Sequence, residues 1–199
     1  MLNSQVLRRG LSISVLSLLA SAAFDLQPTR AHHAFNPQLD AQGEQAFAVL
    51  DGTVRVFRIV NPHGALILNV VDAAGDTTPW LIELNPATQL SREGWTDDIA
   101  PAGQHVTVAV AMSSAQNRGR LRAMLVHADD AAEPSELFVS YGIRGDTQVM
   151  SRLRDRLPSC GIINEDIGRT ACFRIDAAAM NALNDEFPGH FGFVMDAEQ

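Results

Sequence analysis

Residues 65–94 read ALILNVVDAAGDTTPWLIELNPATQLSREG, and this stretch decides the fold. Apolar side chains stand at every second position from Leu66 to Val70, which is typical of a half-buried β-strand. Residues 73–76 (AAGD) predict a turn, and residues 80–84 (WLIEL) predict the strand that returns from it. The first part of the stretch is therefore predicted to be a β-hairpin.

A helix is predicted directly after this hairpin. Asn85 can cap its N-terminus, Pro86 suits the first helical position, and Gly94 ends it. A single helix between the third and fourth strands is the feature that favours an OB-type barrel.

Further strands are predicted on both sides of this stretch. Before it, residues 47–60 are rich in Val, Ile and Phe, and Gly52 interrupts them as a bulge or bend would. After it, strands are predicted at residues 104–112, 121–126 and 137–141. The sequence thus predicts a mainly β fold, with an OB-like small barrel of five to six strands over residues 45–141. A β-sandwich is the alternative.

The first 31 residues follow the pattern of a removable export signal. Arg8 and Arg9 form a charged segment, and residues 11–24 form an apolar run. This run is shorter than the ~20 residues of a membrane-spanning helix. We therefore expect a periplasmic mature protein with no transmembrane segment after signal removal.

Two positions fit cleavage of the signal. Residues 20–22 (ASA) have the small-x-small pattern and place the cut after Ala22 or Ala23. The second position is after Ala31. The second cut would start the mature chain with an N-terminal leader, residues 32–44, whose first residue is a histidine.

The mature chain is expected to be acidic. All 15 basic residues are Arg, and three of them precede the cut after Ala31, together with one of the 23 acidic residues. The mature formal charge is therefore −10. Phosphate binding needs a basic face, so we expect no nucleic-acid partner.

Residues 142–199 are predicted to form a short helical C-terminal extension. Residues 147–157 predict a helix that Pro158 ends, and Asp176 can cap a second helix over residues 177–187.

The two cysteines, Cys160 and Cys172, stand between these predicted helices. In an oxidising compartment a cysteine pair is usually a disulfide, which would hold the extension together. Metal ligation or redox cycling is the alternative.

The histidine pair His32–His33 gives the main chemical lead. An N-terminal histidine can chelate a metal through its α-amine and a ring nitrogen, and this histidine brace binds copper when the fold supplies a further histidine. Imidazole nitrogens suit Cu(II). His63, in the turn after Asn61, is the candidate for that further ligand. The sequence predicts a copper site of His32, His33 and His63, and a solvated leader without metal is the alternative.

The other histidines give no such lead. His105 and His127 alternate with apolar neighbours in strands and are expected to be structural or solvent-facing. His190 stands in a loop with no partner visible in the sequence.

A ligand face on the barrel is a separate hypothesis. OB barrels bind through strands 2 and 3 and the adjoining loops, where Asn61, Trp80, Glu83 and Trp95 are the candidates. Asn61 can instead simply start a turn, and Trp95 can plug the barrel end. The sequence has no G-x-S-x-G, H-E-x-x-H or phosphate-binding glycine motif, so no catalytic residue is predicted.

Several short motifs occur together along residues 31–141. They are AHHAF (31–35), DGTV (51–54), NPH (61–63), Trp80 with Glu83, and REGWT (92–96). In this combination the chain resembles a family of small exported bacterial proteins of unknown function, whose mature chains begin A-H-H-S-F and carry N-P-H and G-W-T motifs. The chain departs from that pattern at Ala34, where Ser is usual, and by its long tail after Tyr141. The resemblance implies export, cleavage after Ala31 and the barrel, and it implies no activity.

Three functions remain open at this point. The leading hypothesis is a periplasmic barrel that binds copper through the histidine pair and His63. The second is a non-catalytic OB-type module that holds a small ligand or a periplasmic protein partner. The third is a copper-dependent oxidase, which needs the same site and an open coordination position.

Overall fold

The computed structural model of the chain describes residues 35–129, 133–140, 143–160 and 172–195. These residues belong to one unit, Phe35–Gln199. The predicted export signal, its cleavage positions and the histidine pair lie outside the described residues. Within the described part of the chain, no helix has the length and the apolar run that a membrane crossing needs.

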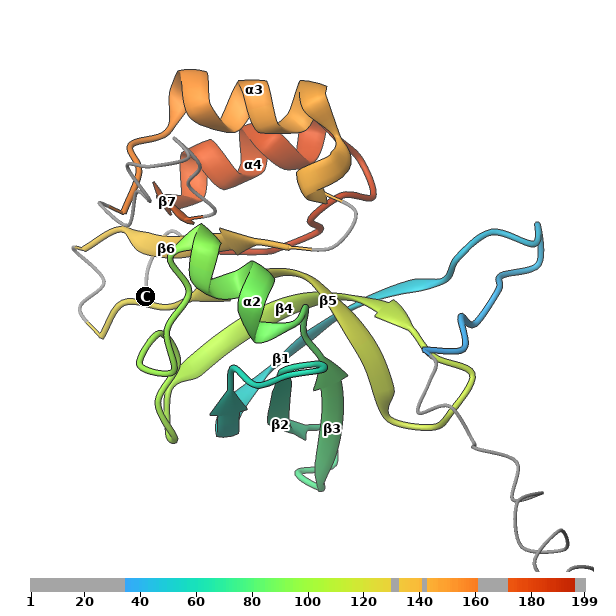
Figure 1. The fold of residues 1–199 in the computed structure, drawn as a ribbon. Helices are drawn as coiled ribbons and strands as arrows, with labels where there is room; N and C mark the ends of the chain where they lie inside the picture. Colours follow the sequence, from blue (N-terminus) through green and yellow to red (C-terminus); the bar gives the residue numbers. More distant parts are fainter. Residues whose placement is uncertain (1–34, 130–132, 141–142, 161–171, 196–199) are drawn as a thin grey trace, which may run out of the picture. The chain divides into compact units, whose positions relative to one another are not determined.

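Five strands form the predicted barrel (Figure 1). They are β1 (Phe47–Arg58), β2 (Ala65–Val71), β3 (Thr77–Glu83), β4 (His105–Met112) and β5 (Arg118–Val126). Neighbours in the order β3-β2-β1-β4-β5 pair antiparallel, and β3 closes the barrel by pairing in parallel with β5. The prediction of a mainly β, OB-like barrel is confirmed.

One short helical segment lies between β3 and β4, as predicted. It consists of α2 (Ala87–Leu90) and the 3₁₀ helix η1 (Ser91–Glu93). Gly94 ends it with a φ of 84°, a left-handed conformation that favours glycine because it has no Cβ.

The predicted cap of this helix by Asn85 is wrong. Pro86 occupies the N-cap position, and no side chain caps the helix. The buried Asn85 amide instead donates to Ser140 Oγ at 3.3 Å and accepts from Arg120 Nη2 at 3.2 Å. The side chain is therefore used in a tertiary hydrogen-bond network, which local sequence does not reveal.

Gly52 lets β2 approach β1 closely. A Cβ added at Gly52 would collide with the carbonyl oxygen of Asn69 on β2. The register shift between β1 and β2 lies slightly further along, between Val54 and Val56. Gly52 thus marks a close backbone approach, and the predicted bulge is next to it.

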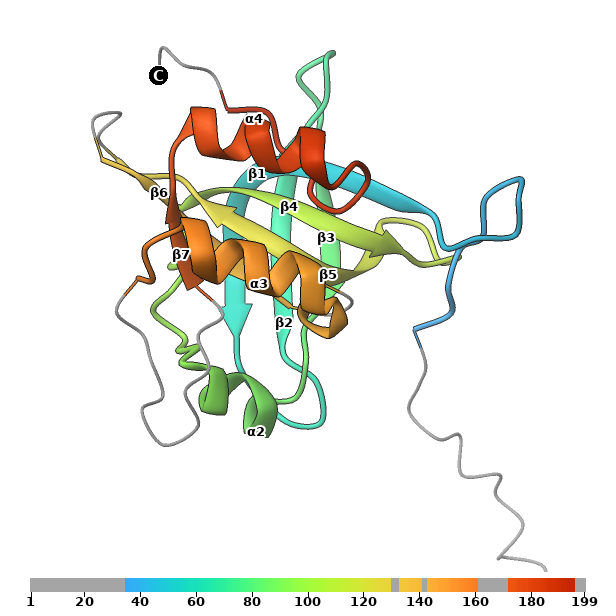
Figure 2. The same cartoon turned by 90° about the horizontal axis from the view of Figure 1, so that it is seen from above.

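Residues beyond β5 extend the same sheet. β6 (Ser135–Val139) pairs with β5, and β7 (Cys172–Ile175) pairs with β6. The helices α3 (Thr147–Arg156) and α4 (Ala177–Glu186) lie over the face of β5 and β6, and the 3₁₀ helix η2 (Ile143–Gly145) precedes α3 (Figures 1 and 2). Both predicted helices are present, but the expectation of a purely helical extension missed β7. Four residues are too few to show an alternating pattern.

Aspartates cap both helices of the extension. Asp146 Oδ1 accepts from the backbone N–H groups of Gln148 and Val149, and Asp176 caps α4 as predicted. His190 Nε2 lies 3.2 Å from the second oxygen of Asp146. His190 thus has a partner that the sequence does not show, because the two residues are 44 positions apart.

The predicted disulfide is confirmed. Cys160 and Cys172 are joined, with their Cα atoms 5.5 Å apart. The backbone N–H of Cys160 also donates to the carbonyl of Cys172. The bond therefore ties the chain after α3 to β7.

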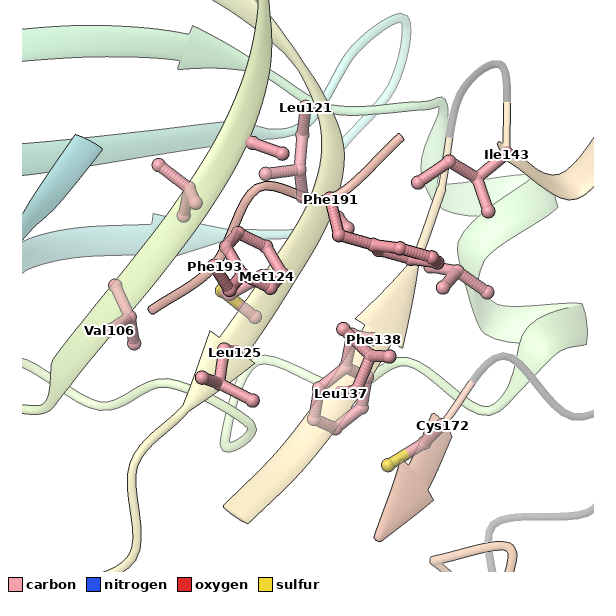
Figure 3. Packing of buried hydrophobic residues seen from close by; sticks show 14 of the residues in the cluster. Val106, Leu121, Met124, Leu125, Leu137, Phe138, Ile143, Cys172, Phe191 and Phe193 are labelled. Carbon is pink, nitrogen blue, oxygen red and sulfur yellow. The ribbon is translucent and has the colours of Figure 1, made fainter. Parts of the chain in front are cut away.

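One hydrophobic core joins the barrel to the extension (Figure 3). The strands β4 and β5 bury most of their side chains on both faces, because the barrel interior lies on one face and the extension covers the other. Buried members from the two parts include Val106, Leu121, Met124, Phe138, Phe191 and Phe193. This shared core fixes the outer face of β4 and β5 against the tail.

Candidate functional site

His63 and Glu83 lie together at one end of the barrel. His63 stands in the turn between β1 and β2, directly after a cis Asn61–Pro62 bond, and Glu83 is the last residue of β3. The ring atom Nδ1 of His63 is 3.3 Å from Oε1 of Glu83, and each side chain is about one-third exposed. The structure therefore brings a predicted metal ligand beside a predicted ligand-face carboxylate.

The remaining ligand-face candidates do not join this pair. Asn61 Oδ1 accepts from the backbone N–H of Thr88, so it fastens the turn to α2. Trp95 is 2% exposed, and its ring packs edge-on against Phe138 with centroids 5.1 Å apart. Its place in the core matches the structural alternative, in which it fills the barrel end.

Trp80 and Glu83 lie on opposite faces of β3. Side chains alternate along a strand, so Trp80 shares a face with the buried Ile82, whereas Glu83 shares the other face with the exposed Leu81. Trp80 is half-buried. Trp80 and Glu83 therefore do not share one face of β3.

The described part of the leader is anchored at the β4–β5 turn. Asn36 Nδ2 donates to Ser114 Oγ at 2.8 Å, and Pro37 forms a bridge with Ser113. The same turn contacts β3, because the N–H of Leu81 donates to the carbonyl of Asn117. The described part of the leader thus lies beside the seam where β3 and β5 close the barrel.

A second cluster lies on the outer face of the barrel, across β1, β4 and the end of β5. The β1–β4 register places Asp51 opposite Thr107. His127 directly follows β5 and lies opposite His105, to whose carbonyl its N–H donates. Because side chains two residues apart share a strand face, these four groups meet on one surface.

The polar atoms of this cluster are within bonding distance of one another. His105 Nε2 lies 2.9 Å from Oδ1 of Asp51. The Thr107 hydroxyl is 2.7 Å from Oδ2 of Asp51 and 2.8 Å from His127 Nε2. One ligand atom from each of Asp51, His105 and His127 lies within 4.8 Å of the other two.

Burial and charge act differently on the two histidines. His127 keeps 19% of its side-chain surface, against 46% for His105 and 62% for Asp51. Burial lowers the pKa of His127, the nearby His105 lowers it further, and the Asp51 carboxylate opposes both effects. His127 is therefore held toward its neutral form, in which a ring nitrogen can bind a metal.

The sequence predicts His105 and His127 separately, as structural or solvent-facing residues. One signal could have joined them, because the two are equally distant from residue 116 in the predicted turn. A hairpin at that turn brings them near each other, and the register shift between Ala109 and Val110 sets them directly opposite. The contribution of Asp51 had no local signal, since it depends on the pairing of β1 with β4.

The cysteines do not provide a further metal site. Glu136 lies close to Cys160 and Cys172, but both sulfurs are joined in the disulfide. Metal ligation needs thiolates, which a disulfide does not offer.

Residues 18–122 match the model of DUF6152, a family of unknown function. The chain belongs to this family. Among curated proteins and among solved structures, no match to the chain was found. The DUF6152 match includes His63, Glu83, Asp51 and His105, and it ends five residues before His127. The extension from β6 onward therefore lies beyond the matched segment.

Proposed function

We propose that this DUF6152 protein is exported and that its mature chain binds copper through His32, His33 and His63. The contact between His63 Nδ1 and Glu83 Oε1 carries the proposal. A carboxylate against one ring nitrogen is the usual outer contact of a metal-binding histidine, because it fixes the ring and raises the basicity of the other nitrogen. The proposal therefore assigns Nε2 of His63 to the metal.

The leader supplies the other ligands of this proposal. Cleavage after Ala31 gives His32 a free α-amine, which can chelate copper together with a ring nitrogen. Nitrogen donors of this kind suit Cu(II), and an acidic mature chain favours a cation over an anion.

The anchoring of the leader supports a route from the pair to His63. His33 precedes Asn36 by three residues, a span of at most about 11 Å. Asn36 is hydrogen-bonded at Ser114, beside the seam where β3 pairs with β5. Glu83, the partner of His63, pairs with β5 at that same seam. The proposal therefore has the histidine pair reach the barrel edge that carries Glu83 from the anchor of the leader at Ser114.

Mass spectrometry of the exported chain tests the first half of the proposal. We expect His32 as the mature N-terminus. A chain that begins at Ala23 or Phe24 would lack the amine chelate and contradict the copper proposal. The non-catalytic binding module would then be the better description.

Calorimetric titration with Cu(II) tests the second half. The wild-type mature chain is compared with His63→Ala and with a chain that carries both His32→Ala and His33→Ala. We expect a large loss of affinity in both variants and no loss in the control His190→Ala, whose ring contacts Asp146 instead. Equal, weak binding by all four proteins would contradict the proposal. Oxidase activity of the copper-loaded wild type would favour the third hypothesis.

A further inference from the structure

The outer face of the barrel carries a set of donors that the proposed copper site does not use. Asp51 comes from β1, His105 from β4 and His127 from the residue after β5. Asp51 and His105 lie within paired strands, and His127, directly after β5, is held opposite His105 by its backbone N–H, which donates to the carbonyl of His105. A site built on paired strands holds its ligands with little loss of conformational freedom on binding.

The spacing of the donor atoms suits one small divalent ion. Bonds of about 2.0–2.2 Å from a first-row ion to imidazole nitrogens and carboxylate oxygens put neighbouring donors roughly 3–4 Å apart. His105 Nε2 lies 2.9 and 3.1 Å from the two oxygens of Asp51. His127 Nε2 lies 4.0 Å from Oδ2 of Asp51. These separations are close to that range. His127 Nε2 also lies 2.8 Å from the Thr107 hydroxyl, so ion binding requires this ring to turn from Thr107 toward Asp51.

We infer that Asp51, His105 and His127 form a second metal site, which binds a divalent first-row transition metal such as Zn(II). The ligand set is two histidines and one carboxylate, a combination that leaves coordination positions open. The exposed sides of Asp51 and His105 give water access to those positions. This site is independent of the histidine pair and of the proposed copper function.

Thr107 has the place of an orienting residue in this site. Its side chain is buried, and its hydroxyl donates to Oδ2 of Asp51 at 2.7 Å. Outer hydrogen bonds of this kind hold a metal-binding carboxylate in position. Thr107 therefore positions Asp51 and does not itself need to bind the ion.

Charge repulsion disfavours a state in which His105 and His127 are both protonated, whereas one metal ion can be bound by both rings. The rings of His105 and His127 are stacked with centroids 4.4 Å apart, so two imidazolium cations would repel each other. A single ion shared by both rings places one positive centre beside Asp51 and uses the rings as neutral ligands.

Zn(II) titration of the mature, disulfide-bonded chain tests this site. The chain carries His32→Ala and His33→Ala, which removes the proposed N-terminal copper ligands. We expect one Zn(II) per chain, and Co(II) in its place is expected to give visible d–d absorption bands. His105→Ala, His127→Ala and Asp51→Asn should each weaken Zn(II) binding at least tenfold and reduce the Co(II) bands.

His190→Ala is the matched control, because it removes a histidine from another His–Asp pair and should leave Zn(II) binding unchanged. Asp51→Asn keeps the shape of the side chain, so it tests the charge even if a histidine variant fails to fold. Absence of saturable Zn(II) binding, or equal binding by all variants, would overturn the inference. Conversely, Cu(II) binding by the wild type that is lost only with His105→Ala would overturn the N-terminal copper proposal and leave this site in place.

Discussion

His105 and His127 lie directly opposite each other, with ring planes 16° apart and centroids separated by 4.4 Å. The stack depends on the β4–β5 register, and the carboxylate of Asp51 lies at its edge. Two basic rings so close together are costly when both are charged. The Asp51 carboxylate offsets this repulsion at His105, and the Thr107 hydroxyl contacts both the carboxylate and the ring of His127.

We predict that Thr107→Val weakens this cluster. Valine keeps the shape of threonine but leaves Asp51 Oδ2 and His127 Nε2 without the hydroxyl at 2.7 and 2.8 Å. The loss should lower the free energy of unfolding by about 1 kcal/mol. Urea unfolding measures this free energy. Thr53→Val is the control, because Thr53 is an exposed threonine on the same face of β1 as Asp51. If the two variants unfold alike, the hydroxyl contributes nothing specific.

Gly52→Ala should destabilise the barrel. An added Cβ would overlap the carbonyl oxygen of Asn69, so β1 and β2 must separate locally. Overpacking of this kind costs about 1–3 kcal/mol. Thermal unfolding beside Gly145→Ala checks it, because a Cβ at Gly145 has nothing within 4 Å. A Gly52→Ala protein as stable as the Gly145→Ala protein would show that the strands can separate without cost.

The sequence was sufficient for the barrel because its signals are local. The hairpin from Leu66 to Glu83 shows an alternating pattern and a short turn, and Gly94 ends the helix after it. The strand β7 gave no such signal, since four residues gain their strand conformation from pairing with β6. The extension was therefore predicted as helical, although its helices were placed within one residue at their C-terminal ends.

The candidate sites were harder to predict than the fold. His63 was singled out from its motif, but its contact with Glu83 depends on the pairing of β2 with β3. The cluster around Asp51 needs two registers at once, and one of them joins residues more than fifty positions apart. Pattern analysis finds strands, whereas such a site depends on how distant strands are aligned.

The stability of the extension should depend on pH through Asp146. The backbone N–H of Val149 is the main cause that lowers the pKa of Asp146, with His190 and Gln148 acting in the same direction. Because the folded-state pKa is below the ordinary value of 3.8, the carboxylate stabilises the fold fully above that value and loses this effect as the pH falls through the folded-state pKa.

The variant Asp146→Asn tests this effect, because asparagine can still cap α3 but cannot pair as an anion with His190. We expect a lower Tm than wild type near neutral pH and a difference that disappears in strong acid. A difference that is constant across the pH range would contradict the electrostatic explanation.

Reduction of the disulfide should destabilise the extension. The bond closes a loop with a sequence separation of 12 residues, for which restriction of the unfolded chain gives about 2–4 kcal/mol. Unfolding with and without a reductant measures this difference.

Thiol titration of the denatured, unreduced protein should find no free cysteine. Two reactive thiols would contradict the disulfide.

The variant Glu83→Gln separates a metal-supporting role of this residue from a structural one. Glutamine keeps the size of the side chain but removes the negative charge that lies 3.3 Å from Nδ1. If His63 binds copper through its other nitrogen, loss of the carboxylate should weaken Cu(II) binding by about 10–100-fold.

Because both side chains are about one-third exposed, we expect only a small change in Tm. Calorimetry and thermal unfolding are measured on the same preparations, with Glu136→Gln on β6 as the control for removing a half-buried carboxylate. Unchanged Cu(II) affinity in Glu83→Gln would contradict a supporting role for the carboxylate, and a large fall in Tm would show that the pair mainly stabilises the turn between β1 and β2.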